Sequence, residues 1–141
     1  MKKIVSAILV TVLVLALGSA AYAYADYGIV VTQNPAGGTW AEGSDASFYA
    51  GAQYYSTMEW AFADPCGIEH PVKEFLEMVP GVTVEGEYTT MLTIHNVTDD
   101  LDGWAVFCRF HSSIDNTKTS WAFIHVADAV PVYGVNPYLG Y

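Results

Sequence analysis

Two short runs decide the fold of this chain: LTIHNV at residues 92–97 and DGWAVFC at residues 102–108. In both runs large apolar side chains recur at every second position, which is the pattern of a strand with one face in a core. Asp99 and Asp100 lie between the runs and are typical of a tight turn. We therefore predict two half-buried strands joined by a short acidic turn.

The remaining sequence predicts further short strands. Val, Thr and aromatic residues are frequent, and glycines and prolines punctuate the chain at short intervals. Residues 73–78 could form one helical turn before Pro80 and Gly81 end it. The predicted strands are residues 29–33, 46–50, 58–63, 82–84, 92–94, 106–110 and 122–126. The chain is therefore predicted to be all-β with about seven strands.

The first 25 residues read as a secretory signal peptide. Lys2 and Lys3 precede an apolar run at 4–17, and overlapping Ala-x-Ala motifs place cleavage after Ala23 or Ala25. The run is short for a membrane span, although retention as an anchor stays open. We expect a bacterial protein that is secreted or associated with the cell surface, with a domain at 26–127 and a C-terminal tail at 128–141 containing Tyr, Pro and Gly.

The charge balance excludes some partners. The chain has 15 acidic and 5 basic residues, a net charge of −10. Cleavage of the leader would leave three basic residues against fifteen acidic ones, a net charge of −12. Such a surface repels phosphate backbones and anionic lipids. We expect no nucleic-acid partner, and no membrane contact after the leader is removed.

The order and spacing of four motifs resemble the bacterial immunoglobulin-like domains of secreted and surface proteins. The motifs are AEG at 41–43 before Ala46 and Phe48, Trp60 with Phe62, Leu92 with Ile94 and Val97, and DGW at 102–104 ahead of Cys108. The resemblance covers about residues 29–126. It implies an immunoglobulin-like two-sheet antiparallel sandwich in which Trp60, Leu92, Ile94, Asp102 and Cys108 are structural. It also implies that the strand at 92–97 crosses over to the strand at 102–108 in the opposite sheet.

Two positions depart from that family pattern. Phe48 and Ala50 stand where the family carries the cysteine that pairs with the position of Cys108. Val106 replaces the tyrosine that the family places two residues before Cys108. The central disulfide and the tyrosine corner are therefore expected to be missing or replaced.

The pairing of the two cysteines stays open. An exported chain with two cysteines suggests a disulfide between Cys66 and Cys108. In the predicted layout Cys108 lies level with Trp60, and the extended chain from there to Cys66 spans about 20 Å, whereas a bridge needs Cα atoms within about 7 Å. A fold-back of the turn at 64–67 would close the gap. The alternative is a buried Cys108 that packs as a small apolar residue and a separate, accessible Cys66.

No catalytic, metal or cofactor site is predicted. Cys66 and His70 have the residue types of a nucleophile and its base, but nothing nearby supplies an oxyanion hole or an orienting partner. The acidic run before Gly103 fails as a calcium loop because Arg109 stands where the bidentate glutamate belongs. The four histidines, at positions 70, 95, 111 and 125, lack the short spacings of metal ligands. We expect a protein that is not an enzyme.

Side-chain parity in the last two strands points to a binding surface. If the even-numbered apolar residues of 106–110 and 122–126 face the core, the residues between them face outward. These outward residues are Phe107, Arg109, His111, Trp121, Phe123 and His125. We call these six residues the aromatic stripe. Aromatic and arginine side chains dominate interface energetics, and exposed apolar patches mark contact surfaces.

A hairpin around residues 115–117 would set the register of the stripe. It predicts three cross-strand neighbours, give or take two residues: His111 with Trp121, Arg109 with Phe123, and Phe107 with His125. Arg109 could then stack on an aromatic ring as a cation–π contact. Two alternatives stay open: the tail at 128–141 covers the stripe, or the cross-strand pairs only stabilise the sheet.

The predicted function is non-covalent recognition. The leading hypothesis is a secreted binding or adhesion module that uses the aromatic stripe to contact an extracellular protein. One alternative is a structural or accessory subunit of an extracellular protein assembly. The other is a carbohydrate-binding domain, since outward aromatic rings can stack on the sugars of a glycan.

Overall fold

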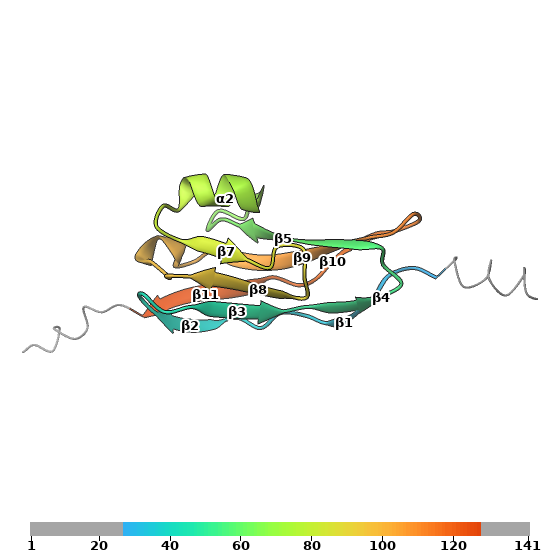
Figure 1. Ribbon diagram of the computed structural model, residues 1–141, viewed down its shortest axis with the longest axis horizontal. Coiled ribbons are helices and arrows are strands. Elements are labelled where there is room, and N and C mark those ends of the chain that lie inside the picture. The colour runs from blue at the N-terminus through green and yellow to red at the C-terminus, as the bar shows by residue number, and fades with distance from the viewer. Residues whose placement is uncertain (1–26, 128–141) are drawn as a thin grey trace, which may run out of the picture.

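Two sheets pack face to face in the computed structural model, which describes residues 27–127 (Figure 1). The predicted leader and the predicted tail lie outside the described residues. Every strand pair is antiparallel except that of β2 with β11, which is parallel. The predicted two-sheet, all-β sandwich is confirmed.

The strands fall into two layers. The larger sheet runs in the order β2 (Gly38–Ala41), β11 (Ala122–Ala127), β9 (Ala105–His111), β5 (Thr57–Ala63) and β6 (Glu69–Pro71), with β10 (Asn116–Lys118) paired to β9. The smaller sheet runs β3 (Ala46–Tyr49), β8 (Met91–His95) and β7 (Thr83–Glu85). A separate pair joins β1 (Val30–Gln33) to β4 (Gly51–Gln53), and β4 continues the path of β3 (Figure 1).

The two runs that predicted the fold lie in opposite sheets, as expected. β8 belongs to the smaller sheet and β9 to the larger one, and the short 3₁₀ helix η1 (Asp99–Leu101) connects them. Asp102 ends this crossover, and its Oδ1 accepts the backbone N–H of Val126 at 2.9 Å. The crossover is therefore tied to the last strand of the larger sheet.

Four of the five structural residues predicted from the family resemblance lie in the core, whereas Asp102 is exposed at the crossover. Trp60, Leu92, Ile94 and Cys108 are buried, and Trp60 lies opposite Cys108 in the pairing of β5 with β9. The Trp60 indole N–H donates to the backbone carbonyl of Thr89 at 2.7 Å. Burying each large apolar side chain contributes about 1.5–3 kcal/mol. The core of residues 27–127 therefore holds the two layers together without a disulfide between them.

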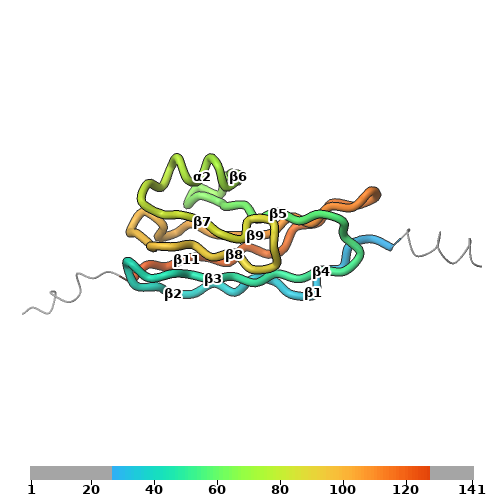
Figure 2. The backbone as a smooth tube through the Cα atoms, viewed as in Figure 1, coloured from blue at the N-terminus to red at the C-terminus, as the bar shows by residue number. Residues whose placement is uncertain are grey.

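The helical turn expected at 73–78 is helix α2 (Val72–Met78). It buries Val72 and Phe75, and the Phe75 ring stacks on Phe62 with ring centroids 3.6 Å apart. Figure 2 shows α2 beside β6 at the border of the larger sheet. Within residues 27–127, no helix is long and apolar enough to cross a membrane.

The described chain contains eleven strands, more than the seven or so expected. The four extra strands, β2, β4, β6 and β10, are short and lack an apolar alternation that the sequence could reveal. The glycine pair at 37–38 indicates a break after the first strand, whereas β2 already begins at Gly38. Main-chain hydrogen bonding to β11 forms this strand, and such pairing requires no particular side chains.

Candidate functional site: the aromatic stripe

The aromatic stripe lies on the outer face of the larger sheet. In β9 the core side is formed by Val106, Cys108 and Phe110, all buried in the main hydrophobic cluster. Phe107 belongs to a second cluster, which is separate from that core. Burial alternates in the first four residues of β11, so Phe123 and His125 face away from the core. The two strands thus bring the six residues to one side of the sheet, but not as the predicted pairs.

The predicted register was wrong. Ala122 lies opposite Val106, and Phe123 lies opposite Ala105. The observed partner of Phe123 is therefore four positions along β9 from the predicted partner, Arg109. The hairpin turn lies at 112–115, where the N–H of Ser112 donates to the carbonyl of Asp115 at 2.8 Å. The prediction centred the turn on Asn116. Each residue by which a turn moves shifts the facing pairs by two. The displaced turn shifts the pairs of β10 by five residues, and a one-residue change of register between β10 and β11 reduces this to the four seen at Phe123.

Phe107 is on the predicted face but is not exposed, which corrects its assignment as a contact residue. Its exposed fraction is 0%, and it packs with Ala61, Ala63 and Ala105. The Trp121 ring stacks over it with centroids 6.2 Å apart and an interplanar angle of 29°. The small alanine side chains leave room for these two rings on the outside of the sheet.

The turn at 64–68 covers part of this outer face. A Cβ placed on Gly67 would lie 3.8 Å from the Trp121 ring, and one on Gly103 would lie 3.5 Å from Pro65. Trp121 is consequently half-buried between Phe107 and this turn. The small residues at alternate positions of β5 are the sequence signal that could have revealed a covered face.

Arg109 forms the predicted cation–π contact, and its partner ring is Phe107. The guanidinium carbon lies 5.2 Å from the ring centroid, and the Lys118 ammonium lies 5.7 Å from the same centroid. Both cations also hold Glu69, with Arg109 Nη2 at 3.2 Å from Oε1 and Lys118 Nζ at 3.0 Å from Oε2. These contacts fix the two side chains above the buried ring.

Glu69 is a site residue that the sequence did not indicate. Burial opposes its ionisation, but hydrogen bonds from Lys118 and Arg109 outweigh that cost and lower the pKa of its carboxyl group. Glu69 lies on β6, which was not predicted as a strand. Two of the five basic residues of an acidic chain converge on this carboxylate, and only the fold brings them together.

The two histidines of the stripe differ in their surroundings. His111 is held at the far end of β9, with Nδ1 2.7 Å from Asn116 Oδ1 and Nε2 3.4 Å from Glu59 Oε1. His125 is exposed, and its Nδ1 lies 3.9 Å from Asp102. His111 therefore belongs to the polar network around β10, whereas His125 faces solvent on β11.

The accessible apolar part of the stripe is centred on Phe123. This side chain is 49% exposed and packs edge-to-face with Trp121, with ring centroids 6.1 Å apart. Of the six predicted residues, Phe123 and His125 are the most accessible, Trp121 is partly so, and Phe107 forms the floor. The surface offered to a ligand is thus smaller than the sequence suggested and is set on a packed support.

The two cysteines are both free thiols, so the Cys66–Cys108 bridge is not formed. Cys108 is buried opposite Trp60, and Cys66 is exposed in the turn after β5. This is the second of the two arrangements that the sequence left open. Its physical reason is the extended run of β5, which carries the chain away from the level of Cys108 before Cys66 is reached.

His70 is engaged by carboxylates. Its Nε2 lies 2.9 Å from Asp64 Oδ2, and its Nδ1 lies 3.1 Å from Glu74 Oε1. Asp64 also accepts the backbone N–H groups of Cys66 and Ile68, each at 2.9 Å. His70 therefore links the turn at 64–68 to helix α2. Among the described residues, no group of three or more His, Cys, Asp and Glu side chains could hold a metal ion.

Comparisons with known proteins show the fold. No protein-family model matches the chain, and no curated protein matches it. One similar solved structure is a chimeric titin Z1Z2 functionalized with a KLER exogenous peptide from decorin, with 22% identity, a TM-score of 0.49, and coverage of 70% of this chain and 93% of that one. Another is that of the titin domains z1z2 in complex with telethonin, with 20% identity, a TM-score of 0.50 and coverage of 70% of this chain.

The match spans 47% of that second titin chain, so about half of it has a counterpart here. At this level of identity the likeness concerns the fold alone. The sandwich of residues 27–127 has an immunoglobulin-like fold.

Proposed function

We propose that this chain is a recognition module that binds another protein without covalent chemistry, through the part of the aromatic stripe centred on Phe123. The observation that carries the proposal is the edge-to-face pair of half-buried Trp121 and exposed Phe123 on a packed support. Aromatic anchors set in well-packed surroundings are the residues that dominate binding at protein interfaces.

The support beneath the pair favours binding because little order is lost on association. Trp121 is held against Phe107, and the ion pairs of Glu69 fix Arg109 and Lys118 beside that ring. A preordered surface loses less side-chain entropy when a partner binds. The fold is compatible with such a role, since the titin domains z1z2 of the second similar structure are in complex with telethonin.

The proposed setting is extracellular, at or near the surface of a bacterial cell. The supporting observation is the signal-like sequence at 1–25. The strong negative charge of the chain favours partners with a neutral or cationic contact surface. In this setting the identity of the partner distinguishes an adhesion module from an accessory subunit.

The test is a pull-down from the surface fraction of the producing organism. Three immobilised forms of the protein are compared: the wild type, Phe123→Ala and Tyr49→Ala. We expect the wild type to retain one stoichiometric partner that Phe123→Ala loses, with an affinity at least about tenfold weaker. The matched control is Tyr49→Ala, which removes an aromatic side chain of similar exposure, 51%, from β3 in the other sheet. Equal capture by Phe123→Ala and the wild type would overturn the use of the stripe.

A glycan array separates the carbohydrate alternative. If the stripe bound sugar, the wild type would bind glycans on the array and Trp121→Ala would lose that signal, since stacking needs the ring. Absence of such a loss, together with a partner lost by Phe123→Ala, favours the protein partner. A partner that co-purifies as a constant stoichiometric complex favours the role of an assembly subunit.

A further inference from the structure

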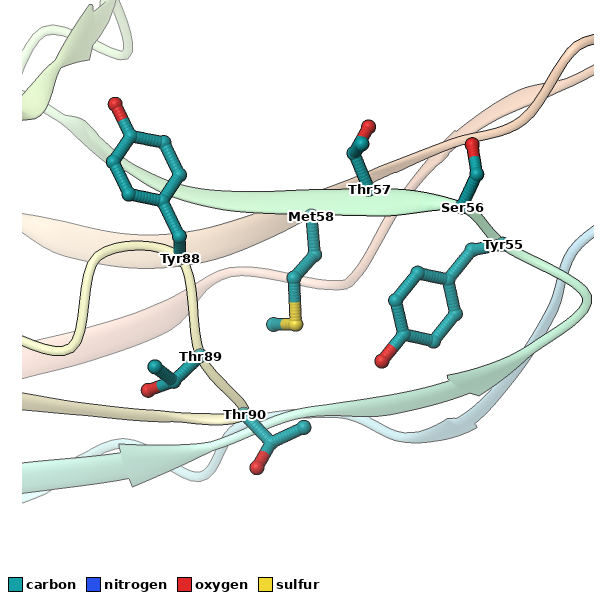
Figure 3. A pocket seen from close by; sticks show the side chains of 7 residues that line it. All are labelled: Tyr55, Ser56, Thr57, Met58, Tyr88, Thr89 and Thr90. Carbon is teal, nitrogen blue, oxygen red and sulfur yellow. The ribbon is translucent and has the colours of Figure 1, made fainter.

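A second candidate surface lies at the end of the sandwich where β4 turns into β5 and the β9–β10 hairpin projects (Figure 2). Two grooves share Tyr55 and Ser56 there. The first has a volume of about 410 Å³ and lies between the start of β5 and the segment 88–90 (Figure 3). The second has a volume of about 330 Å³ and lies between Tyr27, Tyr54 and the hairpin tip at 112–114. We call them the tyrosine grooves.

The chemistry of the tyrosine grooves differs from that of the rest of this acidic chain. Two tyrosines, four Ser or Thr residues and Met58 line the first groove, and three tyrosines, three serines and Ile114 line the second. Among the described residues, none that lines either groove is charged, although the chain has 15 acidic residues. The linings therefore combine aromatic faces with hydroxyl groups.

Two of the tyrosine rings, those of Tyr27 and Tyr88, are accessible, and ring contacts hold Tyr27, Tyr54 and Tyr55 in place. Tyr88 is 68% exposed and Tyr27 is 53% exposed. Tyr27 stacks on Tyr54 with ring centroids 4.9 Å apart, and Tyr55 packs edge-on against the buried Phe110 ring at 4.8 Å. Tyr54 adopts a positive φ of 65°, which is unfavourable for a side chain of this size and is a feature found at functional sites.

The wall of the first groove is fixed by main-chain hydrogen bonds. Trp60 donates its backbone N–H to the carbonyl of Glu87 at 2.9 Å and its indole N–H to the carbonyl of Thr89 at 2.7 Å. Ala50 donates to the carbonyl of Thr90 at 3.0 Å. The segment that carries Tyr88 is thus attached to both sheets, and the groove exists before any ligand arrives.

Several hydroxyl groups in the grooves remain available to a ligand. The side-chain hydroxyls of Thr57, Thr90 and Ser113 make no hydrogen bond to any group within residues 27–127. Each hydroxyl can both donate and accept. Glu87 lies at the rim, where its hydrogen bond with the Tyr88 hydroxyl raises the pKa of that phenol.

We propose that the tyrosine grooves bind a neutral oligosaccharide. A sugar unit presents C–H groups on its faces, which suit an aromatic ring, and hydroxyls at its edges, which pair with Ser and Thr. The volumes are of the order of small-molecule sites, roughly 300–1,000 Å³. An anionic glycan is disfavoured by the net charge of −10 and by Glu87 at the rim. Tyr55 and Ser56 line both grooves, and the proposed ligand is therefore an oligosaccharide that contacts the two grooves rather than a single sugar.

The test is isothermal titration calorimetry with four neutral hexasaccharides: cellohexaose, xylohexaose, mannohexaose and maltohexaose. We expect at least one to bind with a Kd between roughly 10 µM and 1 mM, as suits a shallow site. Tyr88→Ala and Tyr27→Ala are expected to weaken binding at least tenfold, and Tyr88→Phe less than threefold because it keeps the ring. These rings are exposed, so the variants should fold, which circular dichroism checks.

Reciprocal controls separate this proposal from that for the aromatic stripe. Phe123→Ala should bind the hexasaccharide as the wild type does, and Tyr88→Ala should still capture the protein partner. If none of the four sugars binds at about 10 mM, or if both tyrosine variants bind as tightly as the wild type, the oligosaccharide proposal is overturned. Capture of a protein partner that Tyr88→Ala alone loses would assign the tyrosine grooves to a protein instead, and would overturn it as well.

Discussion

His70 is an imidazole with a carboxylate within hydrogen-bond distance of each ring nitrogen. Both nitrogens can donate only when the ring is protonated, so this arrangement stabilises the imidazolium. Hydrogen bonds to Asp64 and then to Glu74 raise the pKa of His70 above its ordinary value of 6.5, against a smaller opposing effect of burial. The same contact with His70 is the main reason that the pKa of Asp64 is lowered.

A pH-dependent contribution to stability follows. Because the pKa of His70 is higher in the folded chain than in the unfolded one, its stabilisation is complete below pH 6.5 and disappears as the pH rises through the folded pKa. We expect His70→Gln to destabilise the domain more at about pH 5.5 than at about pH 8.5 in urea unfolding. The matched control is His125→Gln, which replaces an exposed imidazole, and we expect it to lose less stability at about pH 5.5 than His70→Gln does. An equal loss for His70→Gln at both would contradict the arrangement.

Cys108 and Cys66 should differ in reactivity. Burial raises the pKa of the Cys108 thiol to about 12, while Cys66 is exposed. Only the thiolate is a nucleophile, so we expect Ellman's reagent at about pH 8 to label one thiol per native chain and two in denaturant. Cys66→Ser should abolish the native reaction. Rapid labelling of both thiols in the native state would show that Cys108 is not buried.

At the scale of an element, the turn between β7 and β8 depends on Gly86. Its φ is +86°, and a Cβ there would collide with the carbonyl oxygen of Met91. Gly43 has a similar φ of +81° but open space around it. We expect Gly43→Ala to lower the free energy of unfolding by about 1 kcal/mol from backbone strain alone. Gly86→Ala should lower it by about 2–4 kcal/mol, because strain and collision add.

Chemical denaturation of both alanine variants checks this difference. Since Gly86 also begins the segment that carries Tyr88, its variant should weaken oligosaccharide binding at the tyrosine grooves, whereas Gly43→Ala should not. Equal losses of stability in the two variants would mean that the turn adjusts its path without cost.

At the scale of the whole molecule, the net charge of −10 repels itself. Self-repulsion destabilises a compact chain, and salt screens it, with a Debye length that falls from about 30 Å at 0.01 M to about 8 Å at 0.15 M. We expect the Tm to rise by about 2–4 °C over this range. The rise should shrink near pH 4, where many carboxylates are protonated. A Tm that falls with added salt would mean that ion pairs such as those of Glu69 outweigh the repulsion.

Local pattern was sufficient for much of the fold. The alternation in 92–97 and 102–108 predicted two strands, and the short run before Pro80 predicted α2. The family resemblance, and not the alternation, placed the two strands in opposite sheets. These features depend on which residues within one strand or turn are apolar, so each can be recognised in a single continuous stretch of sequence. The short strand β2 escaped prediction because pairing with the distant strand β11 creates it. The strands β6 and β10 pair with their chain neighbours β5 and β9, and they escaped prediction because three residues without apolar alternation give no strand signal.

The sequence by itself determined that the last strands turn the aromatic stripe to one side of a sheet, since parity along a strand is a local property. Only the tertiary structure decided what remains accessible there. The position of the hairpin turn set the register between β9 and β11. Pairing of β6 with β5 placed Glu69 beside Arg109 and Lys118. The turn at 64–68 packs near the Trp121 ring. Phe107 was thereby buried and Phe123 left open. The tyrosine grooves likewise join segments far apart in the chain, so exposure and recognition here are products of packing between distant residues.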